Sequence, residues 1–421
     1  MKRIAFLESN LSGSGFQSLK IAKDLGLHVT FITRDLDRYL LVPGGSHYFE
    51  QYVDEIRYCE TNNVESVITE LKEELESNYY SAFMTLGEYD VPVAAEIAKR
   101  YNFPGLNPEA AYTSRNKANT RRVCAEKGVP APKFWTVETL EDILNVIDEV
   151  TFPCIVKPAD ETSSTDVIRC LNKEEVINHF KSIKSKRVNT RGQKRSQEIL
   201  IEEFLIGYEV SVETITSKNN TYVLGVTDKL LSGNDHFVEV GHIFPSCLPE
   251  DVIKDCHNVV KLALDAIGFD FGVAHTELKI TKDGPKLIEI NARPAGDKIP
   301  DLVEYSLNLS SLKQLLLMSL GEEPDITNLV PYRGAAIRFL ISPPGVITEY
   351  AGVELIDSLN GIQEYSIPNL KGRLVNPLTK NGERLGYVVA TGRTAFEAAR
   401  IAEAAVQQVS IKLKEEEKVI I

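Results

Sequence analysis

Residues 275–294 have the sequence His-Thr-Glu-Leu-Lys-Ile-Thr-Lys-Asp-Gly-Pro-Lys-Leu-Ile-Glu-Ile-Asn-Ala-Arg-Pro. Two segments of alternating polar and apolar residues flank the Thr-Lys-Asp-Gly-Pro turn, and this pattern predicts a β-hairpin. Pairing of Ile280 with Lys286 across a five-residue loop places Glu277 directly opposite Glu289. Because strand side chains alternate between faces, both carboxylates are expected on one face of the hairpin.

The same register places His275 opposite Asn291 on that face. Like charges directly opposite one another destabilise a sheet, so paired glutamates are expected to hold a cation. Two carboxylates and an amide oxygen suit magnesium, which keeps part of its coordination shell for water and phosphate oxygens. Arg293 follows at strand spacing and is a bidentate donor for a phosphoryl group or a carboxylate. The hairpin thus predicts a magnesium-nucleotide phosphoryl-transfer site; the alternative is an ordinary solvated hairpin face.

Length and composition indicate a soluble globular protein of several domains. The chain has 421 residues, of which 43% are hydrophobic and 25% charged, and two to four domains are expected. The net charge of −13 argues against nucleic acid or an anionic membrane as the main partner. The early polar N-terminal residues predict no secretory signal, and no segment approaches the roughly 20 apolar residues of a membrane span. The six scattered cysteines fit a reducing cytoplasm, the expected location.

Residues 1–112 alternate strands and helices, which predicts a parallel, Rossmann-like sheet. A Ser-Gly-Ser-Gly turn at 12–15 follows the first strand. A dinucleotide fingerprint is incomplete there, because Ser18 stands where the third glycine belongs. We expect this turn to line a substrate pocket instead. The predicted strands are 2–8, 28–34 and 81–86, and the predicted helices are 16–25 and 91–101.

Three further regions follow. Residues 113–200 are predicted to contain a linker helix and an α/β subdomain, 201–330 an antiparallel sheet closed by the opening hairpin, and 331–421 a small α+β domain whose last helix spans 394–413. Residues 181–197 carry many lysines and arginines with little apolar content. Such a run is either a solvated loop or a mobile basic flap that reaches nucleotide phosphates.

Several other motifs could bind a nucleotide or a substrate. Lys157 ends an apolar strand just before a Thr-Ser-Ser-Thr loop, where it could reach phosphates or simply snorkel at a sheet rim. The Glu202-Glu203-Phe-Leu205 run could read adenine through its backbone, with Glu209 on the ribose. The Glu239-Val-Gly-His242 loop offers an acid and an imidazole near neutral pH. His236 and His257 are weaker candidates.

Taken together, these motifs resemble the ATP-grasp superfamily of carboxylate–amine ligases. They are Asn116-Lys117, Ile155-Val-Lys157-Pro, Glu202-Glu-Phe-Leu-x-Gly-x-Glu209, Glu277 and Glu289-Ile-Asn-x-Arg-Pro294. The resemblance covers nearly the whole chain and implies a pre-ATP-grasp domain, a lid, a central ATP-grasp sheet and an added C-terminal domain. Within the superfamily the chain looks most like bacterial L-amino acid ligases, on the Glu239-x-x-His242 loop and the stretch 384–399.

The resemblance implies a role for each motif residue. Catalytic roles fall to Lys157, His242 and Arg293, and the metal ligands would be Glu277, Glu289 and Asn291. The expected cofactors are ATP and two Mg²⁺ ions, which Mn²⁺ could replace. ATP would be bound by Lys117, Lys157, Ser163, Ser164, Glu202, Glu203, Leu205, Glu209 and Arg293. The substrate would be bound by Glu88, Glu239, His242, Arg293, Gly296 and Asp297.

The implied reaction activates one amino acid as an acyl-phosphate and joins it to the amine of a second to form a dipeptide. Asp297 could favour a basic substrate, a hypothesis that requires Asp297→Ala to lose that preference. The alternatives are a ligase of a nucleotide, cofactor or antibiotic precursor, and a non-catalytic nucleotide-binding protein. A dimer through the N-terminal domain is common among similar proteins. One departure stands out, because residues 159–166, the predicted lid loop, contain no glycine.

Overall fold

The computed structural model describes residues 1–11, 13–232 and 237–414, so Ser12 of the predicted turn and His236 lie outside the described part. Contacts along the backbone divide the chain into two units. The first contains residues 1–224, 250–300 and 310–327, and the second contains 225–249, 301–309 and 328–421. The two are described separately.

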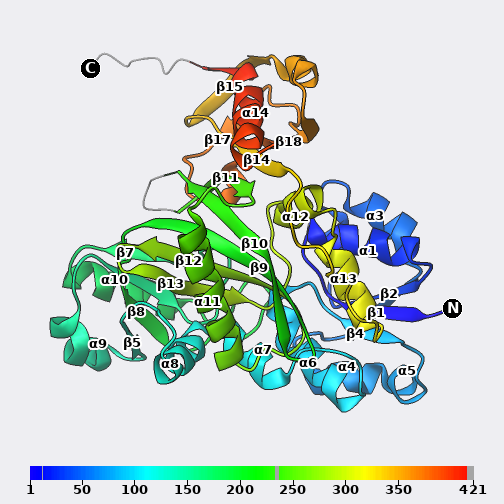
Figure 1. Ribbon diagram of the computed structural model, residues 1–421. Helices are drawn as coiled ribbons and strands as arrows, with labels where there is room; N and C mark the ends of the chain where they lie inside the picture. Colours follow the sequence, from blue (N-terminus) through cyan, green and yellow to red (C-terminus); the bar gives the residue numbers. More distant parts are fainter. Residues whose placement is uncertain (12, 233–236, 415–421) are drawn as a thin grey trace, which may run out of the picture. The chain divides into compact units, whose positions relative to one another are not determined.

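The N-terminal part of the first unit is a parallel sheet in the order β3-β2-β1-β4, as the βα alternation predicts (Figure 1). Ile4 pairs with Val29 on one side and with Ala82 on the other, which fixes β1 between β2 and β4. Apolar side chains of both strand faces are buried, as is usual in a parallel sheet covered by helices. The elements are β1 Arg3–Leu7, α1 Ser14–Asp24, β2 His28–Thr33, α2 Asp37–Leu40, α3 Gly45–Tyr52, β3 Glu55–Tyr58, α4 Val64–Glu70, α5 Lys72–Glu76, β4 Ala82–Met84, a 3₁₀ turn Glu88–Asp90 and α6 Val91–Arg100.

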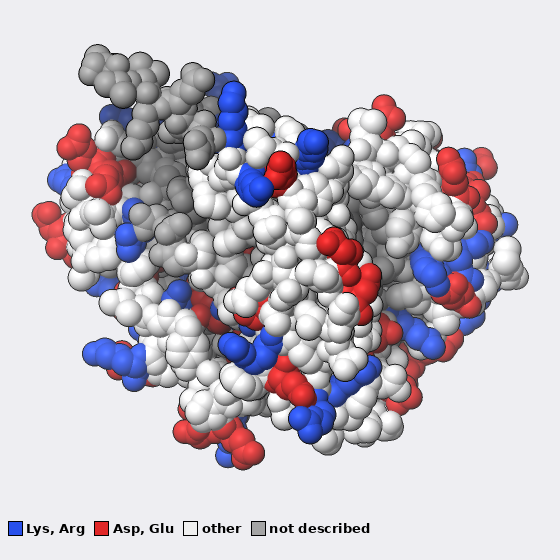
Figure 2. Space-filling model, turned by 90° about the horizontal axis from the view of Figure 1, so that it is seen from above, with Lys and Arg blue, Asp and Glu red and all other residues white. Residues whose placement is uncertain are grey.

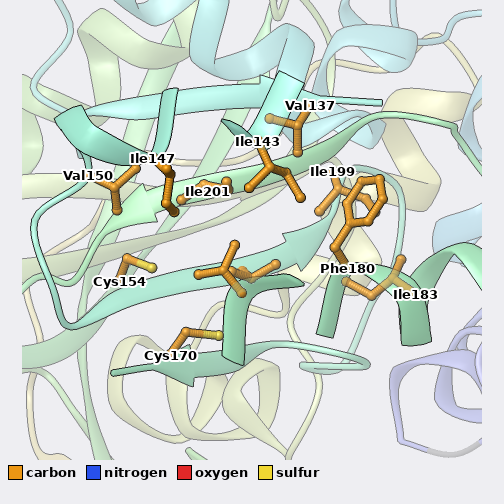
Figure 3. Close-up of a cluster of buried hydrophobic side chains, with 12 residues drawn as sticks. Val137, Ile143, Ile147, Val150, Cys154, Cys170, Phe180, Ile183, Ile199 and Ile201 are labelled. Carbon is orange, nitrogen blue, oxygen red and sulfur yellow. The ribbon is translucent and has the colours of Figure 1, made fainter. Parts of the chain in front are cut away.

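Two short helices, α7 Pro108–Arg115 and α8 Lys117–Lys127, lead into a four-stranded antiparallel sheet in the order β5-β8-β6-β7. This sheet and its helices form the subdomain predicted to be the lid, and we call it the lid subdomain. Its interior is a closed apolar cluster in which Ile143 of α9, Phe180 of α10 and Ile201 of β8 converge (Figure 3). The elements are β5 Phe134–Val137, α9 Leu140–Val146, β6 Cys154–Pro158, β7 Ile168–Cys170, α10 Lys173–Ser185 and β8 Ile199–Glu203.

The rest of the first unit is built on an antiparallel ladder in the order β13-β12-β9, with β10 as the next strand. Helix α11 packs against β13 and β9 (Figure 1). The chain passes from the first unit to the second within β10, between Leu224 and Gly225. The elements are β9 Tyr208–Ser217, β10 Asn220–Leu231, α11 Glu250–Ala266, β12 Gly272–Thr281, β13 Gly284–Asn291 and α13 Ser311–Ser319; α12 Ile299–Leu307 begins in this unit and continues in the second.

In the second unit the sheet continues as β10-β11-β14-β18-β16, and α14 packs on β14 and β18. A small sheet in the order β17-β15-β19 completes this unit. The elements are β11 Glu239–Phe244, β14 Gly334–Leu340, β15 Gly345–Ala351, β16 Ile362–Ser366, β17 Leu374–Val375, β18 Gly386–Gly392, α14 Ala395–Gln408 and β19 Ser410–Leu413.

The prediction of a helix over 394–413 is wrong at its C-terminal end. Thr394 caps the helix by accepting a hydrogen bond from the Glu397 amide at 3.1 Å, but α14 ends at Gln408. The last residues form β19, in which Ser410 pairs with Ala351 of β15. The Val-Ser-Ile-Lys-Leu sequence at 409–413 alternates apolar and polar residues, so strand pairing with β15 overrides the preceding helical pattern.

Among the described residues no helix is both long and apolar enough to cross a membrane. Figure 2 shows one face of the molecule, on which acidic and basic side chains are interspersed over the described part. This face therefore presents a mixed field, not a single-sign one, to a charged partner.

Candidate active site

The β12–β13 hairpin has the predicted pairing at its functional end. Glu277 lies opposite Glu289, and His275 opposite Asn291. The predicted turn is wrong, however. Ile280 pairs with Pro285, so only Lys282 and Asp283 connect the strands.

A bulge reconciles the tight turn with the predicted register. Leu278 pairs with Leu287 and Glu277 with Glu289, so Ile288 is the extra residue of β13. The carbonyl of Ile288 accepts a hydrogen bond from Nη2 of Arg121 in α8 at 2.7 Å. The bulge shifts the register by one residue and thereby brings the two glutamates opposite each other.

A histidine lies between two carboxylates beside this pair. His275 is buried; its Nδ1 lies 3.0 Å from Glu213 of β9, and its Nε2 lies 3.2 Å from Glu277. Burial opposes a charge on the imidazole, but the two carboxylates outweigh burial and raise the pKa of His275 to about 9. A protonated His275 compensates part of the negative charge gathered by the acids and fixes the side chain of Glu277.

We call the face of the hairpin that carries Glu277 and Glu289 the acid face. Lys117 provides a second cation there. Asn116 caps α8 by accepting hydrogen bonds from the amides of Ala118 and Asn119, which places Lys117 at the first position of the helix. The Lys117 ammonium lies 3.2 Å from Oε2 of Glu289 and donates a hydrogen bond to the carbonyl of Glu161 in the lid loop at 2.6 Å. Glu277 and Glu289 are each about one fifth exposed, at 21% and 19%, so both remain accessible to a ligand.

Arg293 is held in place by Glu88, at the carboxyl end of β4. Oε2 of Glu88 accepts hydrogen bonds from Nε of Arg293 at 2.9 Å and from Nη2 at 2.5 Å, while Arg115 of α7 donates to Oε1 at 3.2 Å. Burial works against ionisation of Glu88, but Arg293 and Arg115 outweigh it and lower its pKa. Glu88 therefore remains a carboxylate that orients the guanidinium of Arg293.

Lys157 and Glu202 form a buried cluster with Arg121. Oε2 of Glu202 lies 2.7 Å from the Lys157 ammonium, and Oε1 accepts a hydrogen bond from Nε of Arg121 at 2.8 Å. All three side chains are almost fully buried. Burial raises and the two cations lower the pKa of Glu202, with a net lowering; burial lowers the pKa of Lys157. The carboxylate of Glu202 thus positions Lys157 from inside the lid subdomain.

The other predicted nucleotide residues line β8 and β9. Glu203 is 41% exposed and lies 3.3 Å from Lys286, whereas Leu205 is buried. Glu209 lies 3.0 Å from the ammonium of Lys279. Glu203 and Glu209 are thus each paired with a lysine of the β12–β13 hairpin.

The lid loop reaches unusual backbone conformations without glycine. Ser163, Ser164 and Asp166 have φ angles of 53°, 55° and 59°, in the left-handed region that favours glycine. Ser163 and Ser164 are exposed, and the loop is closed by a hydrogen bond from the Thr165 amide to the Thr162 carbonyl at 3.0 Å. The backbone therefore adopts a glycine-like shape while keeping two hydroxyl groups available.

The remaining predicted substrate residues divide between the two units. In the first unit, Gly296 is exposed and Asp297 has a left-handed φ of 50° just beyond Arg293. In the second unit, Glu239 lies 2.7 Å from Lys229 and accepts a hydrogen bond from Nδ2 of Asn381 at 2.9 Å. His242 of β11 is fully buried, with its ring 6.1 Å from that of Phe339.

Sequence reasoning missed several residues of this site. Arg115 and Arg121 lie on helices outside the motifs used above, yet they orient Glu88 and Glu202. Glu213 lies on a strand that the sequence predicts, but the sequence alone gives this residue no role. Its role comes from its pairing opposite His275. The helical spacing of Lys117 and Arg121 (four residues apart, hence one helix face) was a usable signal.

Comparison with known proteins agrees with the observed fold. Residues 150–301 match the model of the ATP-grasp domain, and residues 338–414 match L-amino acid ligase C-terminal domain 2. The crystal structure of L-amino acid ligase from Bacillus licheniformis superposes with a TM-score of 0.79 at 22% identity, covering 99% of each chain. The chain therefore contains an ATP-grasp domain and an L-amino acid ligase C-terminal domain, and the predicted ATP-grasp fold is confirmed.

Two curated relatives are informative. The chain is 24% identical to the uncharacterized protein y4rH of Sinorhizobium fredii, over 97% of this chain and 83% of that protein. It is 28% identical to alanine–anticapsin ligase of Bacillus subtilis, over 62% of this chain and 59% of that enzyme. The second alignment spans less than two thirds of the relative's length.

Proposed function

We propose that this protein is an ATP-dependent carboxylate–amine ligase that joins two amino acids into a dipeptide through an acyl-phosphate. One observation carries the proposal: Glu277, Glu289 and Asn291 share a partly exposed face of the hairpin, with Lys117 at 3.2 Å from Glu289. The match of residues 150–301 to the ATP-grasp domain and the likeness to L-amino acid ligases support it.

The donor set fits magnesium. Two carboxylates and an amide are hard oxygen ligands, and the positions of Lys117 and His275 beside the two acids support a face that attracts positive charge. Glu277, Glu289 and Asn291 would hold the metal, which would supply neutralisation of the phosphate oxygens of ATP. The ammonium groups of Lys117 and Lys157 would then contact the remaining phosphate oxygens.

The chemical role of the chain's own residues follows from their constraints. A carboxylate anion is a poor electrophile, so it must first be activated: one of its oxygens attacks the γ-phosphorus of ATP, ADP leaves, and an acyl-phosphate is formed. Arg293, fixed by Glu88, presents its guanidinium to the transferred phosphoryl group and to the acyl-phosphate that results. A neutral amine of the second amino acid then attacks the acyl carbon, and phosphate leaves as the amide bond forms.

Water must be excluded while the acyl-phosphate waits for the amine. The lid loop is linked to the acid face through Lys117, which donates a hydrogen bond to the Glu161 carbonyl. Its exposed serines can donate to phosphate oxygens once the lid subdomain closes. Closure would therefore bind ATP and shield the intermediate in one movement.

The test is phosphate release from magnesium-ATP across all pairs of the twenty amino acids, with mass spectrometry of the products. Phosphate release that depends on two amino acids, together with a dipeptide mass, is the expected result. Absence of magnesium-ATP binding would exclude the acid face as the nucleotide site.

A second candidate keeps the chemistry and changes one substrate. The Bacillus subtilis relative is an alanine–anticapsin ligase, so one partner of the bond need not be among the twenty amino acids. If ATP binds and no pair in the screen turns over, the acceptor or donor belongs to another class, such as a nucleotide or cofactor precursor.

A further inference from the structure

The basic segment between α10 and β8 exposes most of its residues, but two of its arginines, Arg191 and Arg195, are buried. Residues 186–197 double back through a bridge between Val188 and Lys194. At the tip, Oδ1 of Asn189 accepts hydrogen bonds from the amides of Arg191 at 2.8 Å and Gln193 at 3.0 Å. We call residues 186–197 the basic hairpin. The tip of the basic hairpin is thus a defined turn, and Arg191 lies in this turn.

Arg191 is buried in the N-terminal part of the first unit, with 3% of its surface exposed. Its Nη2 lies 2.8 Å from Oε2 of Glu8, which is fully buried at the end of β1. Glu8 also accepts hydrogen bonds from the hydroxyls of Thr61 and Tyr39, both at 2.6 Å. Since a buried carboxylate needs a cation, removing Arg191 would leave Glu8 uncompensated.

The C-terminal arm of the basic hairpin holds the lid loop. Nε of Arg195 lies 3.0 Å from Glu161, and its two terminal nitrogens lie 3.1 Å from Asp166. The Ser196 amide donates to Asp160 at 2.5 Å. Three acids of the lid loop are therefore bound by this arm.

The tip also contacts the turn that orients the active-site arginine. Nε2 of Gln193 donates to the carbonyl of Tyr89 at 3.1 Å, and the Tyr89 hydroxyl donates to Glu161 at 2.8 Å. Tyr89 is the neighbour of Glu88, which holds Arg293. The basic hairpin thus joins the N-terminal sheet, the lid loop and the Glu88 turn.

We propose that Arg191 is a positioning residue that, seated on Glu8, keeps the lid loop over the reacting phosphate. It acts through Arg195 on the lid loop and through Gln193 on the Glu88 turn. This inference rests on the proposed ligase function for its chemical consequence. With Arg191 removed, the lid loop loosens, water reaches the acyl-phosphate, and more phosphate is released per amide bond formed.

The experiment is hydrogen–deuterium exchange by mass spectrometry on the full chain carrying Arg191→Gln, with and without magnesium and a non-hydrolysable ATP analogue. We expect exchange to rise about tenfold or more in both the basic hairpin and the lid loop. Arg187→Gln is the matched control, because Arg187 is an exposed residue of the same hairpin; it should leave both segments unchanged. An increase confined to the basic hairpin would overturn the proposal.

Two further variants keep the test decisive. If Arg191→Gln fails to fold, the double variant Glu8→Gln/Arg191→Gln removes the uncompensated buried charge and permits the same measurement. On an active enzyme, Arg191→Gln should raise the ratio of phosphate to amide, while Arg191→Lys should restore part of the coupling. The exchange result does not depend on turnover, so failure of the ligase proposal and failure of this one are distinguishable.

Discussion

Glu289 is the residue on which the proposed chemistry depends most. It belongs to the acid face, lies 3.2 Å from Lys117, and supplies a negative charge to a divalent cation that a neutral amide does not supply. Glu289→Gln should lower turnover at least about a hundredfold, the scale of a lost electrostatic contact in a transition state. Asp283→Asn, an exposed acid in the turn of the same hairpin, is the control and should retain activity. Phosphate-release assays on both variants check this; equal rates would remove Glu289 from the metal site.

Asp90 gives a prediction about stability and pH. It is buried beside Glu8, and burial with this neighbouring charge outweighs Arg191, Arg34 and Arg38 and raises its pKa from 3.8 to about 7. The folded state therefore binds a proton more tightly than the unfolded state, so this group's contribution to stability falls as pH rises from about 4 to 7. Asp90→Asn removes the titration and should stabilise the protein more at pH 8 than at pH 4.5.

The check on Asp90 is thermal unfolding of both proteins across that pH range. The difference in melting temperature should grow with pH and flatten above about pH 7, where Asp90 is ionised in both states. A constant difference at every pH would show that the folded carboxyl titrates at an ordinary pKa.

At the scale of elements, the backbone conformation of the lid loop leads us to expect an uncommon effect of glycine substitution on stability. Ser164 has a left-handed φ of 55°, so Ser164→Gly relieves strain and should change the free energy of unfolding by less than about 1 kcal/mol. Ser164→Val should destabilise by about 1–2 kcal/mol or more, because a branched side chain resists this conformation. Ser182→Gly in α10 is the reference for glycine in a helix, expected to destabilise by about 0.5 kcal/mol. Denaturant unfolding measures all three; a large loss in Ser164→Gly would contradict the strained geometry.

The lid subdomain has its own core. Two neighbouring residues of α9 differ in burial and so provide a matched pair of variants. Ile143 is fully buried in the cluster of Figure 3, whereas Leu144 is 55% exposed. Ile143→Ala should destabilise the protein by about 2–5 kcal/mol, since it leaves a cavity. Leu144→Ala should change stability by about 0.5 kcal/mol or less. Thermal unfolding of the pair distinguishes them, and similar losses in both would show that α9 does not pack as described.

Sequence predicted the hairpin because its side-chain period of two is local and strong. The opposition of Glu277 and Glu289 was correct even though the turn was not, because a two-residue connection and the bulge at Ile288 offset each other. The bulge has no sequence pattern of its own, and the end of α14 is marked only by the short alternation at 409–413. Both depend on partners distant in sequence: Arg121 for the first and β15 for the second.

At the scale of the whole molecule, sequence motifs predicted the fold but not the charges that connect its parts. Lys117, Lys157 and Arg293 were predicted to be functional, and the structure supplies the acids that hold them: Glu289, Glu202 and Glu88. The basic run at 181–197 was expected to be a solvated loop or a phosphate-binding flap. Most of the run is exposed, but Arg191 is buried against Glu8, and Arg195 is buried against Glu161 and Asp166. Long-range ion pairs leave no periodic signal, so sequence could not assign them.

The central claim is that the chain activates a carboxylate as an acyl-phosphate. The most direct test supplies both amino-acid substrates, identified by the pairwise screen, with ¹⁸O in their carboxylates, and measures the isotope content of the released phosphate. The proposed mechanism predicts one ¹⁸O atom in each phosphate, because a carboxylate oxygen bridges to phosphorus and leaves with it. Unlabelled phosphate formed together with the amide product would contradict the mechanism.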